Sequence, residues 1–339
     1  MSNLNIGPED IAYSFGENVV SNIQLKEEHP DWDMDQVFQR TGVRSRPIAA
    51  PGETALSMAV KATEKLFEKI KIKRSEVGAL IFCTQTPDHI LPPNSSLLHG
   101  QLGLPENVMA FDINHACSGF IYSVGIARGL IESGVSKNVL VVTADTYSRL
   151  IHPQDRSTLS LFGDGAASTL ISGESPRLNI LDMSFGSSGK NACRFIVKNG
   201  GMKDSKSLRN NLLPDASGRV NSPDHIYMDG MGVLSFFTSA IPPVVRELLE
   251  KNNKSVEDID FFVFHQASTL ALGGLARALN IPQEKMIIDL EDTGNLVSAS
   301  IPVALGRLLE KNVLKKGQLV VLCGFGVGLS WGAALMEAQ

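Results

Sequence analysis

The sequence has few of the features that mark secreted, membrane-bound or nucleic-acid-binding proteins. Its 339 residues include only four cysteines, without a CxxC pair, so neither a disulfide framework nor a zinc site is indicated. The net charge of −5 is spread without long blocks of one sign, which argues against a nucleic-acid arm or a polybasic tether but leaves an acidic carrier partner open. The N-terminal ten residues lack the basic and apolar regions of a signal peptide, so we expect a cytoplasmic globular protein without a metal.

One uncharged stretch is long enough to cross a bilayer. Residues 317–336 carry no charge over twenty positions, the length of a membrane span. Five glycines interrupt this stretch, however, and they divide it into Leu319–Cys323, a turn at 324–328, and Leu329–Met336. The pattern predicts two strands joined by a turn, and no membrane insertion.

Short apolar runs alternate with helical patterns in the first half of the chain. Val77–Phe82, Val108–Ile113 and Val139–Thr143 are continuously apolar, which is typical of strands covered on both faces. Between them, Ser95–Leu102 and Phe120–Glu132 carry apolar residues at helical spacing. The alternation predicts an α/β fold with a largely parallel sheet.

The second half of the sequence weakly repeats the first. Five segments match in the same order: residues 76–82 with 258–264, 102–105 with 279–282, 111–112 with 288–289, 126–134 with 305–312, and 140–142 with 319–321. A period of about 180 residues is far too long for a solenoid, so the repeat indicates a duplicated α/β unit. Two such halves are expected to pack pseudo-symmetrically and bring their equivalent loops face to face.

These patterns predict a domain division. We expect an N-terminal half over residues 1–175 and a C-terminal half over 230–339. Residues 173–229 are rich in Asn, Ser, Gly and Lys and lose periodicity, which indicates a loop-rich insertion or lid. A helix is expected from Met231 to Asn252, with a boundary or kink at Pro242-Pro243.

Cys117 is the best candidate nucleophile. It follows an expected strand and precedes an apolar helix, in the segment Asp112-Ile-Asn-His-Ala-Cys-Ser-Gly-Phe120. Unpaired N–H groups at a helix start favour a thiolate, so the position is expected to lower the thiol pKa. The alternative is a buried cysteine that acts as a small hydrophobe, which we expect for Cys83 and Cys323.

Two further polar residues occupy related positions in the second half. His265 ends a predicted strand, and Asn295 lies on a turn that leads into a helix, where each alone fits a structural role. By the repeat, Asn295 is the counterpart of the Cys117 turn and His265 the counterpart of Cys83. Cys, His and Asn together suit either hydrolysis through an acyl-enzyme or acyl transfer to carbon.

Whole motifs resemble a known family. Residues 115–120 (HACSGF), 265–268 (HQAS) and 294–302 (GNLVSASIP) are similar to the Cys, His and Asn motifs of thiolase-fold condensing enzymes, most of all the β-ketoacyl-acyl-carrier-protein synthases of type III. Further matching segments are 40–44, 86–92, 162–166 and 324–332. The resemblance implies a thiolase-like αβαβα fold of five layers, decarboxylative Claisen condensation of an acyl-CoA with malonyl-acyl-carrier-protein, a homodimer, and no cofactor.

The resemblance also implies residue roles. Cys117 takes the acyl group, and the backbone N–H groups of Cys117 and Val327 form the oxyanion hole. His265 and Asn295 bind the malonyl thioester oxygen. The residues implied in CoA or pantetheine binding are Arg156, Arg40, Trp32 and Ser268. Leu91 lies near the residue that the family's dimer partner inserts into the acyl pocket.

Some positions depart from the family pattern. Ser268 and Leu270 stand where many members have Asn and Arg, which removes an amide and a cation near the pantetheine entrance. His115 replaces a small residue two positions before Cys117, and packing under the turn is the simpler interpretation of it. The departures favour a specialised member whose starter or carrier differs from that of fatty-acid initiation.

Several functions remain open on the sequence alone. A transferase that forms an ester, an amide or a non-standard carbon–carbon bond would keep Cys117 and His265. The chain could also be one subunit of a heterodimeric condensing enzyme, including a silent partner, or a cysteine hydrolase.

Overall fold

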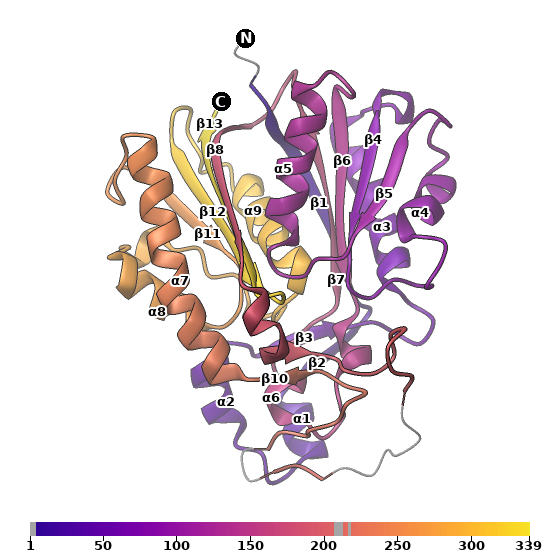
Figure 1. Ribbon diagram of the computed structural model, residues 1–339, viewed down its shortest axis with the longest axis vertical. Coiled ribbons are helices and arrows are strands. Elements are labelled where there is room, and N and C mark those ends of the chain that lie inside the picture. Colours follow the sequence, from indigo (N-terminus) through magenta and orange to yellow (C-terminus); the bar gives the residue numbers. More distant parts are fainter. Residues whose placement is uncertain (1–4, 207–212, 216–217) are drawn as a thin grey trace.

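The computed structural model describes residues 5–206, 213–215 and 218–339, in which helices and sheets alternate in five layers (Figure 1). The first sheet has the strand order β1-β7-β6-β4-β5. Its strands are β1 (Gly7–Phe15), β4 (Ala79–Cys83), β5 (Met109–Ile113), β6 (Asn138–Asp145) and β7 (Gly165–Ser172). β4 runs parallel to both β5 and β6, as the three apolar runs predict, and β7 runs antiparallel to β6 and β1.

The second sheet has the strand order β11-β12-β13-β8. Its strands are β8 (Leu178–Ser187), β11 (Phe261–Phe264), β12 (Leu319–Gly326) and β13 (Ser330–Ala338). The uncharged stretch at 317–336 therefore forms an antiparallel strand pair, as expected, with the first strand extended to Gly326. A bridge between Phe262 and Met286 adds one parallel pairing outside β11.

The two sheets have the same topology. Read from β8, the order β8-β13-β12-β11 and the Met286 bridge reproduces the order and strand directions of β1-β7-β6-β4-β5. The duplicated α/β unit is thus present.

The domain boundary differs from the sequence expectation. The second sheet already begins with β8, inside the expected loop-rich insertion at 173–229. Polar residues alternate along this half-buried edge strand, which hid it from a search for apolar runs. Further along, β9 (Phe195–Ile196) pairs with β10 (Tyr227–Met228), and residues 207–212 and 216–217 of the expected insertion lie outside the described residues.

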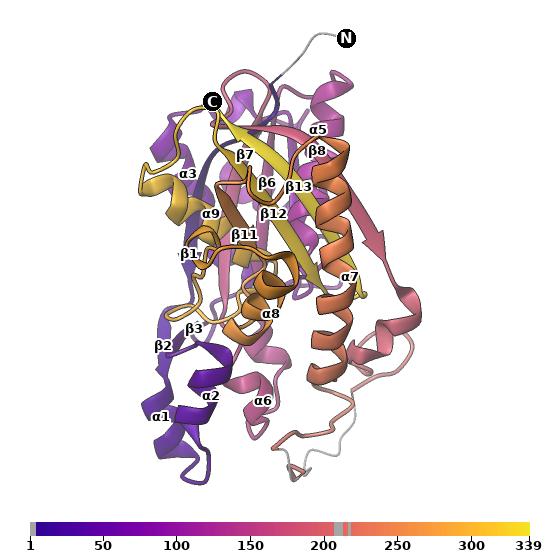
Figure 2. The same cartoon turned by 90° about the vertical axis from the view of Figure 1, so that its left-hand side faces the viewer.

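Two helices fill the layer between the sheets, and two pairs cover the outer faces (Figures 1 and 2). The middle layer contains α5 (Gly119–Glu132) and α9 (Ser300–Glu310), packed in one apolar cluster with strands of both sheets. On the first sheet lie α3 (Ala55–Ile70) and α4 (Asn94–Leu102), and on the second lie α7 (Gly230–Lys251) and α8 (Thr269–Leu279). The shared middle layer makes one body of the two halves.

The helix α7 continues through both of its prolines, so the helix boundary, one of the two alternatives expected at Pro242-Pro243, is absent. Among the described helices it alone has the length and hydropathy of a membrane span. Phe237, Ile241 and Val245 nevertheless pack into the cluster over the second sheet, as in a core helix. Tertiary packing therefore holds the helix together where the prolines remove backbone hydrogen bonds.

Short elements gather at one end of the molecule (Figure 1). They are β2 (Asn18–Ser21), α1 (Asn22–Glu28), α2 (Met34–Thr41), β3 (Ser45–Ile48) and α6 (Arg156–Leu159). The 3-10 turns are η1 (Arg74–Glu76), η2 (Tyr147–Leu150), η3 (Gly189–Arg194), η4 (Gln283–Lys285) and η5 (Val297–Ala299).

Candidate active site

Cys117 lies buried at the start of the central helix α5. It follows β5, and the helix begins two residues later at Gly119. The end of β12 comes so close that a Cβ on Gly326 would lie 2.6 Å from the Cys117 Cβ and 2.8 Å from its Sγ. Only glycine allows this approach, which brings the backbone N–H of Val327 to the sulfur alongside that of Cys117 itself.

The electrostatics of the thiol differ from the sequence expectation. Burial raises the pKa of Cys117, and the nearby Asp145 carboxylate raises it further, whereas the N–H groups of Cys117 and Val327 lower it. The expected net lowering of the pKa was therefore wrong, because desolvation outweighs the helix-start donors. The two N–H neighbours of the sulfur are placed to stabilise negative charge once charge develops there.

His265 follows directly after β11 and is neutral. Burial lowers the pKa of its imidazole from 6.5 to about 3. Its ring packs edge-on against Phe325, with centroids 5.6 Å apart and an interplanar angle of 85°. Among the described residues, its Nδ1 atom has no hydrogen-bond partner. A neutral imidazole carries a single ring N–H, which can donate one hydrogen bond to a substrate oxygen without delivering a full charge.

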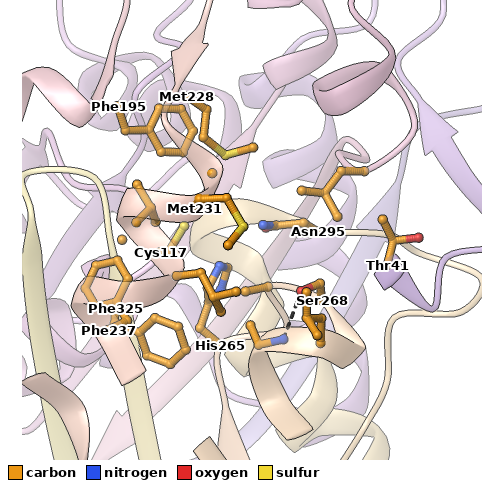
Figure 3. Close-up of a pocket in the computed structure, with 18 of the residues that line it drawn as sticks. Thr41, Cys117, Phe195, Met228, Met231, Phe237, His265, Ser268, Asn295 and Phe325 are labelled. Atoms are coloured by element: carbon orange, nitrogen blue, oxygen red, sulfur yellow. Dashed lines mark hydrogen bonds between the residues drawn. The ribbon is translucent and has the colours of Figure 1, made fainter. Parts of the chain in front are cut away.

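Asn295 is clamped by backbone hydrogen bonds on the turn before α9. Its N–H donates to the Leu161 carbonyl at 2.9 Å, and its own carbonyl accepts from Gly163 at 3.1 Å. Its side-chain Oδ1 accepts from the Val297 N–H at 2.9 Å. This leaves the amide nitrogen directed inward, as Figure 3 shows. Asn295 is thus fixed as a hydrogen-bond donor.

One cavity of about 390 Å³ joins these three side chains. Cys117, His265 and Asn295 all line it, so the structure brings together the three residues predicted from the sequence (Figure 3). Most of its remaining wall is apolar and includes Phe162, Phe195, Met228, Met231, Phe237 and Phe325. The sequence offered no signal for these residues, because apolar positions in helices and strands usually belong to the core.

The predicted thioester-binding residues are only partly gathered there. Arg40 and Ser268 line the cavity, and the Ser268 hydroxyl also caps α8 by accepting from the Ala271 N–H at 3.1 Å (Figure 3). Trp32 instead stacks on His29, with ring centroids 3.9 Å apart and an interplanar angle of 8°. Two of the predicted residues, Arg40 and Ser268, therefore line the cavity with Cys117.

Two other predicted residues lie elsewhere. Arg156 begins α6, where its N–H donates to the Gly218 carbonyl at 3.1 Å and its side chain lies beside the same glycine. Leu91 is 79% exposed on the connection between β4 and α4. Neither lines the cavity within the part of the chain that the structure describes.

Sequence reasoning missed Asp145, at the end of β6. This fully buried carboxyl accepts from the Gln85 N–H at 2.8 Å and from the Ser298 hydroxyl at 2.5 Å, so it ties the first half to the Asn295 turn of the second. Burial raises its pKa to about 7. Its place at the carboxyl end of an apolar, parallel strand was an available signal, since such strand ends line sites in α/β proteins.

Across the described residues, no group of three or more His, Cys, Asp or Glu side chains is arranged to hold a metal. The polar groups at the cavity are suited instead to a carbonyl substrate: a sulfur nucleophile, paired N–H donors beside it, and two further donors opposite. This is the arrangement needed to stabilise an oxyanion at one point and an enolate at another.

Comparisons with known proteins agree with one another. Residues 111–189 match the family model described as 3-oxoacyl-[acyl-carrier-protein] synthase III, and residues 249–338 match the model of its C-terminal part. The β-ketoacyl-[acyl-carrier-protein] synthases III of Clostridium perfringens and Fusobacterium nucleatum are 35% and 33% identical to this chain. These alignments cover 94% and 98% of the chain and 95% and 98% of the relatives.

Solved structures give the same result. A crystal structure of a 3-oxoacyl-(acyl-carrier-protein) synthase III aligns over 98% of this chain and 99% of its own, with a TM-score of 0.93 and 38% identity. The enzyme of that name from Aquifex aeolicus aligns over 98% of this chain and all of its own, with a TM-score of 0.85 and 31% identity. The priming β-ketosynthase of the R1128 polyketide pathway aligns over 98% and 96%, with a TM-score of 0.84 and 30% identity.

Proposed function

Because the chain belongs to the β-ketoacyl-acyl-carrier-protein synthase III family, it is a condensing acyltransferase, and we propose that Cys117, His265 and Asn295 carry out its chemistry. The family and five-layered fold predicted from the motifs are confirmed. The observation that supports the assignment of residues is that these three buried side chains line one mostly apolar cavity. Exclusion of water from such a cavity strengthens each hydrogen bond to a developing charge.

In the first half-reaction, Cys117 accepts an acyl group from a starter acyl-CoA. The sulfur attacks the thioester carbonyl, the C–S bond to CoA breaks, and the thiol proton ends on the departing CoA sulfur. The tetrahedral oxyanion is bound by the N–H groups of Cys117 and Val327, which already face the sulfur. Burial raises the pKa of the resting thiol, and these donors favour the negative charge that develops as the thiol reacts.

In the second half-reaction, a malonyl thioester replaces the departed CoA. Ring N–H and amide N–H groups of His265 and Asn295 bind its thioester oxygen, which becomes an enolate oxygen as CO₂ leaves. The enolate carbon then attacks the acyl-enzyme, the C–S bond to Cys117 breaks, and a β-ketoacyl thioester is released. The Cys117 thiolate takes up a proton from solvent, which restores the resting thiol. Neutrality of His265 suits this role, because the imidazole donates a hydrogen bond and keeps its proton.

The substrates and assembly follow the same assignment. Acyl-CoA is the starter and malonyl-acyl-carrier-protein the extender, with Arg40 and Ser268 at the cavity in reach of a pantetheine arm. A second copy of the chain pairs along β5, the edge of the first sheet, and contributes the exposed Leu91 to the site. Arg156 and Trp32 as CoA contacts, a specialised starter, and a cytoplasmic location stay predictions.

The test separates the two half-reactions with variants on opposite sides of the cavity. Intact mass spectrometry follows the acyl increment on the enzyme, and labelled malonyl-carrier protein reports CO₂ release. Cys117→Ala is expected to abolish the acyl increment, whereas Asn295→Ala keeps it and slows CO₂ release by about 10²–10³-fold. The exposed Cys193→Ala is the matched control and should behave as the unmodified protein.

Other outcomes point to other functions. An acyl increment that survives on Cys117→Ala would contradict the assignment of the nucleophile. Acyl transfer to an alcohol or amine without CO₂ would indicate an ester- or amide-forming transferase. An acyl-enzyme that turns over with water alone would indicate a hydrolase, and a chain never acylated by any acyl-CoA would fit a silent subunit.

A further inference from the structure

His115 lies outside the cavity but close behind the nucleophile. It stands two residues before Cys117, is half-buried, and is not among the residues that line the cavity in the described chain. Its ring stacks on Tyr122 of α5, with centroids 4.3 Å apart and an interplanar angle of 24°. Tyr122 in turn contacts the exposed ring of Phe185 on β8, edge to face at 5.1 Å. Packing alone could explain the ring but not its polar contact.

A chain of hydroxyl groups leads from His115 to the turn that carries Val327. His115 Nδ1 lies 3.3 Å from the Ser118 hydroxyl, which lies 2.8 Å from the Ser330 hydroxyl. The Ser330 hydroxyl donates to the Val327 carbonyl at 2.9 Å. Both serines are buried, and they come from opposite halves of the molecule, one beside Cys117 and the other at the start of β13.

The direction of this chain is fixed by its last acceptor. A carbonyl only accepts, so the Ser330 proton must point to Val327, and Ser330 must then accept from Ser118. Ser118 has thereby used its only proton, so it must accept from His115 Nδ1–H. His115 is therefore the donor that completes the chain, in the tautomer with its proton on Nδ1.

The turn that is held in this way needs such support. Val327 presents its N–H to the Cys117 sulfur. The next residue, Gly328, has a φ of 139°, and glycine has little intrinsic preference for one backbone conformation. Holding the Val327 carbonyl restricts the φ and ψ angles of Val327, and this restricts the direction of its N–H. The second tether in the turn is the Ser188 N–H, which donates to the Leu329 carbonyl at 2.7 Å.

We propose that His115 is a positioning residue, which acts through Ser118 and Ser330 to hold the Val327 N–H against the reacting centre. This proposal rests on the proposed function, because it assigns the Val327 N–H to the oxyanion of the acyl-transfer step. It also gives His115 a role in the rate of acylation. A displacement of an oxyanion donor by about an ångström costs up to about 10²-fold in rate.

The test uses two substitutions that separate packing from hydrogen bonding. His115→Phe keeps a ring to stack on Tyr122 but has no donor, whereas His115→Asn places an amide N–H near the Nδ1 position but has no ring. We expect His115→Phe to slow single-turnover acylation by about tenfold with an unchanged KM for acyl-CoA, and His115→Asn to stay within about threefold of the unmodified rate. Ser118→Ala should slow acylation similarly, and adding His115→Phe to it should cost little more.

Alkylation of Cys117 by iodoacetamide at fixed pH supplies a readout that needs no acyltransferase activity. It should slow in His115→Phe and not in His115→Asn, because the displaced Val327 N–H no longer favours the thiolate. A fast Phe variant with a slow Asn variant, in either assay, would overturn the proposal in favour of packing. If the unmodified protein is alkylated but never acylated, the proposed function fails, and the alkylation rates still decide the role of His115.

Discussion

The two halves of the molecule share one topology and divide the chemistry between them. At the end of the equivalent strands β4 and β11, the first half has the buried Cys83 and the second has His265. At the equivalent turns into the central helices, the first half has Cys117 and the second has Asn295. In the proposed mechanism, one half supplies the sulfur that holds the acyl group, and the other supplies the donors that bind the extender oxygen. The duplicated fold brings both sets of side chains to the lining of one cavity.

The strands β6 and β12 extend this contrast. Matched through the repeat, the Asp145 carboxyl at the end of β6 corresponds to Gly324 in β12. Asp145 reaches across to Ser298, whereas a Cβ on Gly324 would lie 2.8 Å from the Cys117 carbonyl oxygen. The first half therefore contacts the second through a polar side chain, whereas the second half contacts the first through the backbone of a glycine.

The largest effect is expected from a substitution that prevents the close approach of the β12 backbone to Cys117. Gly326→Ala places a methyl group 2.8 Å from the Cys117 sulfur, so the Val327 turn must move away. We expect acylation to slow by about 10²-fold or more, as for loss of an oxyanion donor. Gly129→Ala is the control within α5, because no neighbouring atom lies within 4 Å of its added Cβ. Equal acylation rates in the two variants would contradict the assignment of Val327.

A smaller effect distinguishes the two equivalent strand ends by pH. Burial lowers the folded-state pKa of His265 to about 3. Below pH 6.5 the unfolded chain therefore binds a proton at this residue, whereas the folded protein does not. Above pH 6.5 the neutral His265 imidazole costs the folded protein no stability through protonation. As the pH falls from 6.5 toward 3, the free energy of unfolding decreases by about 1.4 kcal/mol per pH unit.

Urea unfolding at pH 6.5 and pH 5 measures this contribution. We expect the unmodified protein to lose about 2 kcal/mol over this interval from His265, and His265→Asn to lose nothing at that position. Cys83→Ala, at the counterpart position, should lower stability equally at both values, because burial raises the pKa of this thiol well above its usual range. Parallel losses in His265→Asn and the unmodified protein would show that the imidazole is protonated in the folded state.

The smallest effect concerns the sheet edges. In the first sheet β5 is an edge strand with Met109 45% exposed, which suits pairing with a second copy. Met109→Lys introduces two like charges into such a symmetric interface and should weaken the dimer by about tenfold, or ~1.4 kcal/mol. Val313→Lys, 44% exposed in the second half, should leave the dimer intact. Sedimentation gives the mass relative to the 36.6 kDa chain, and identical behaviour of both variants would argue against pairing along β5.

The sequence was most informative where burial is continuous. Parallel strands such as β6 are covered on both faces and appear as unbroken apolar runs, and the motifs around Cys117, His265 and Asn295 identified the residues that meet at the cavity. The strand β8 was missed because one of its faces is polar, so its sequence resembles that of a loop. Local sequence patterns therefore identify a buried strand only when the side chains of consecutive residues are buried.

Properties that depend on distant residues were the ones that local reasoning missed. The pKa of Cys117 was expected in the wrong direction because its raised value comes from burial and from Asp145, on a different strand. The hydroxyl chain from His115 joins residues more than 200 positions apart, which no local motif encodes.

The position of β13 in the sequence has a consequence for the folding of the nascent chain. Among the described strands of the second sheet, β8 pairs with β13 alone, yet β8 ends at Ser187 and β13 begins at Ser330. During synthesis on the ribosome, β8 is therefore complete long before its partner in this sheet is made. The Val327 N–H and the Ser330 hydroxyl are made at the same late stage. In the proposed mechanism, a nascent chain that already contains Cys117, His265 and Asn295 still lacks the Val327 donor of the oxyanion, so we expect acylation only after this last segment has folded.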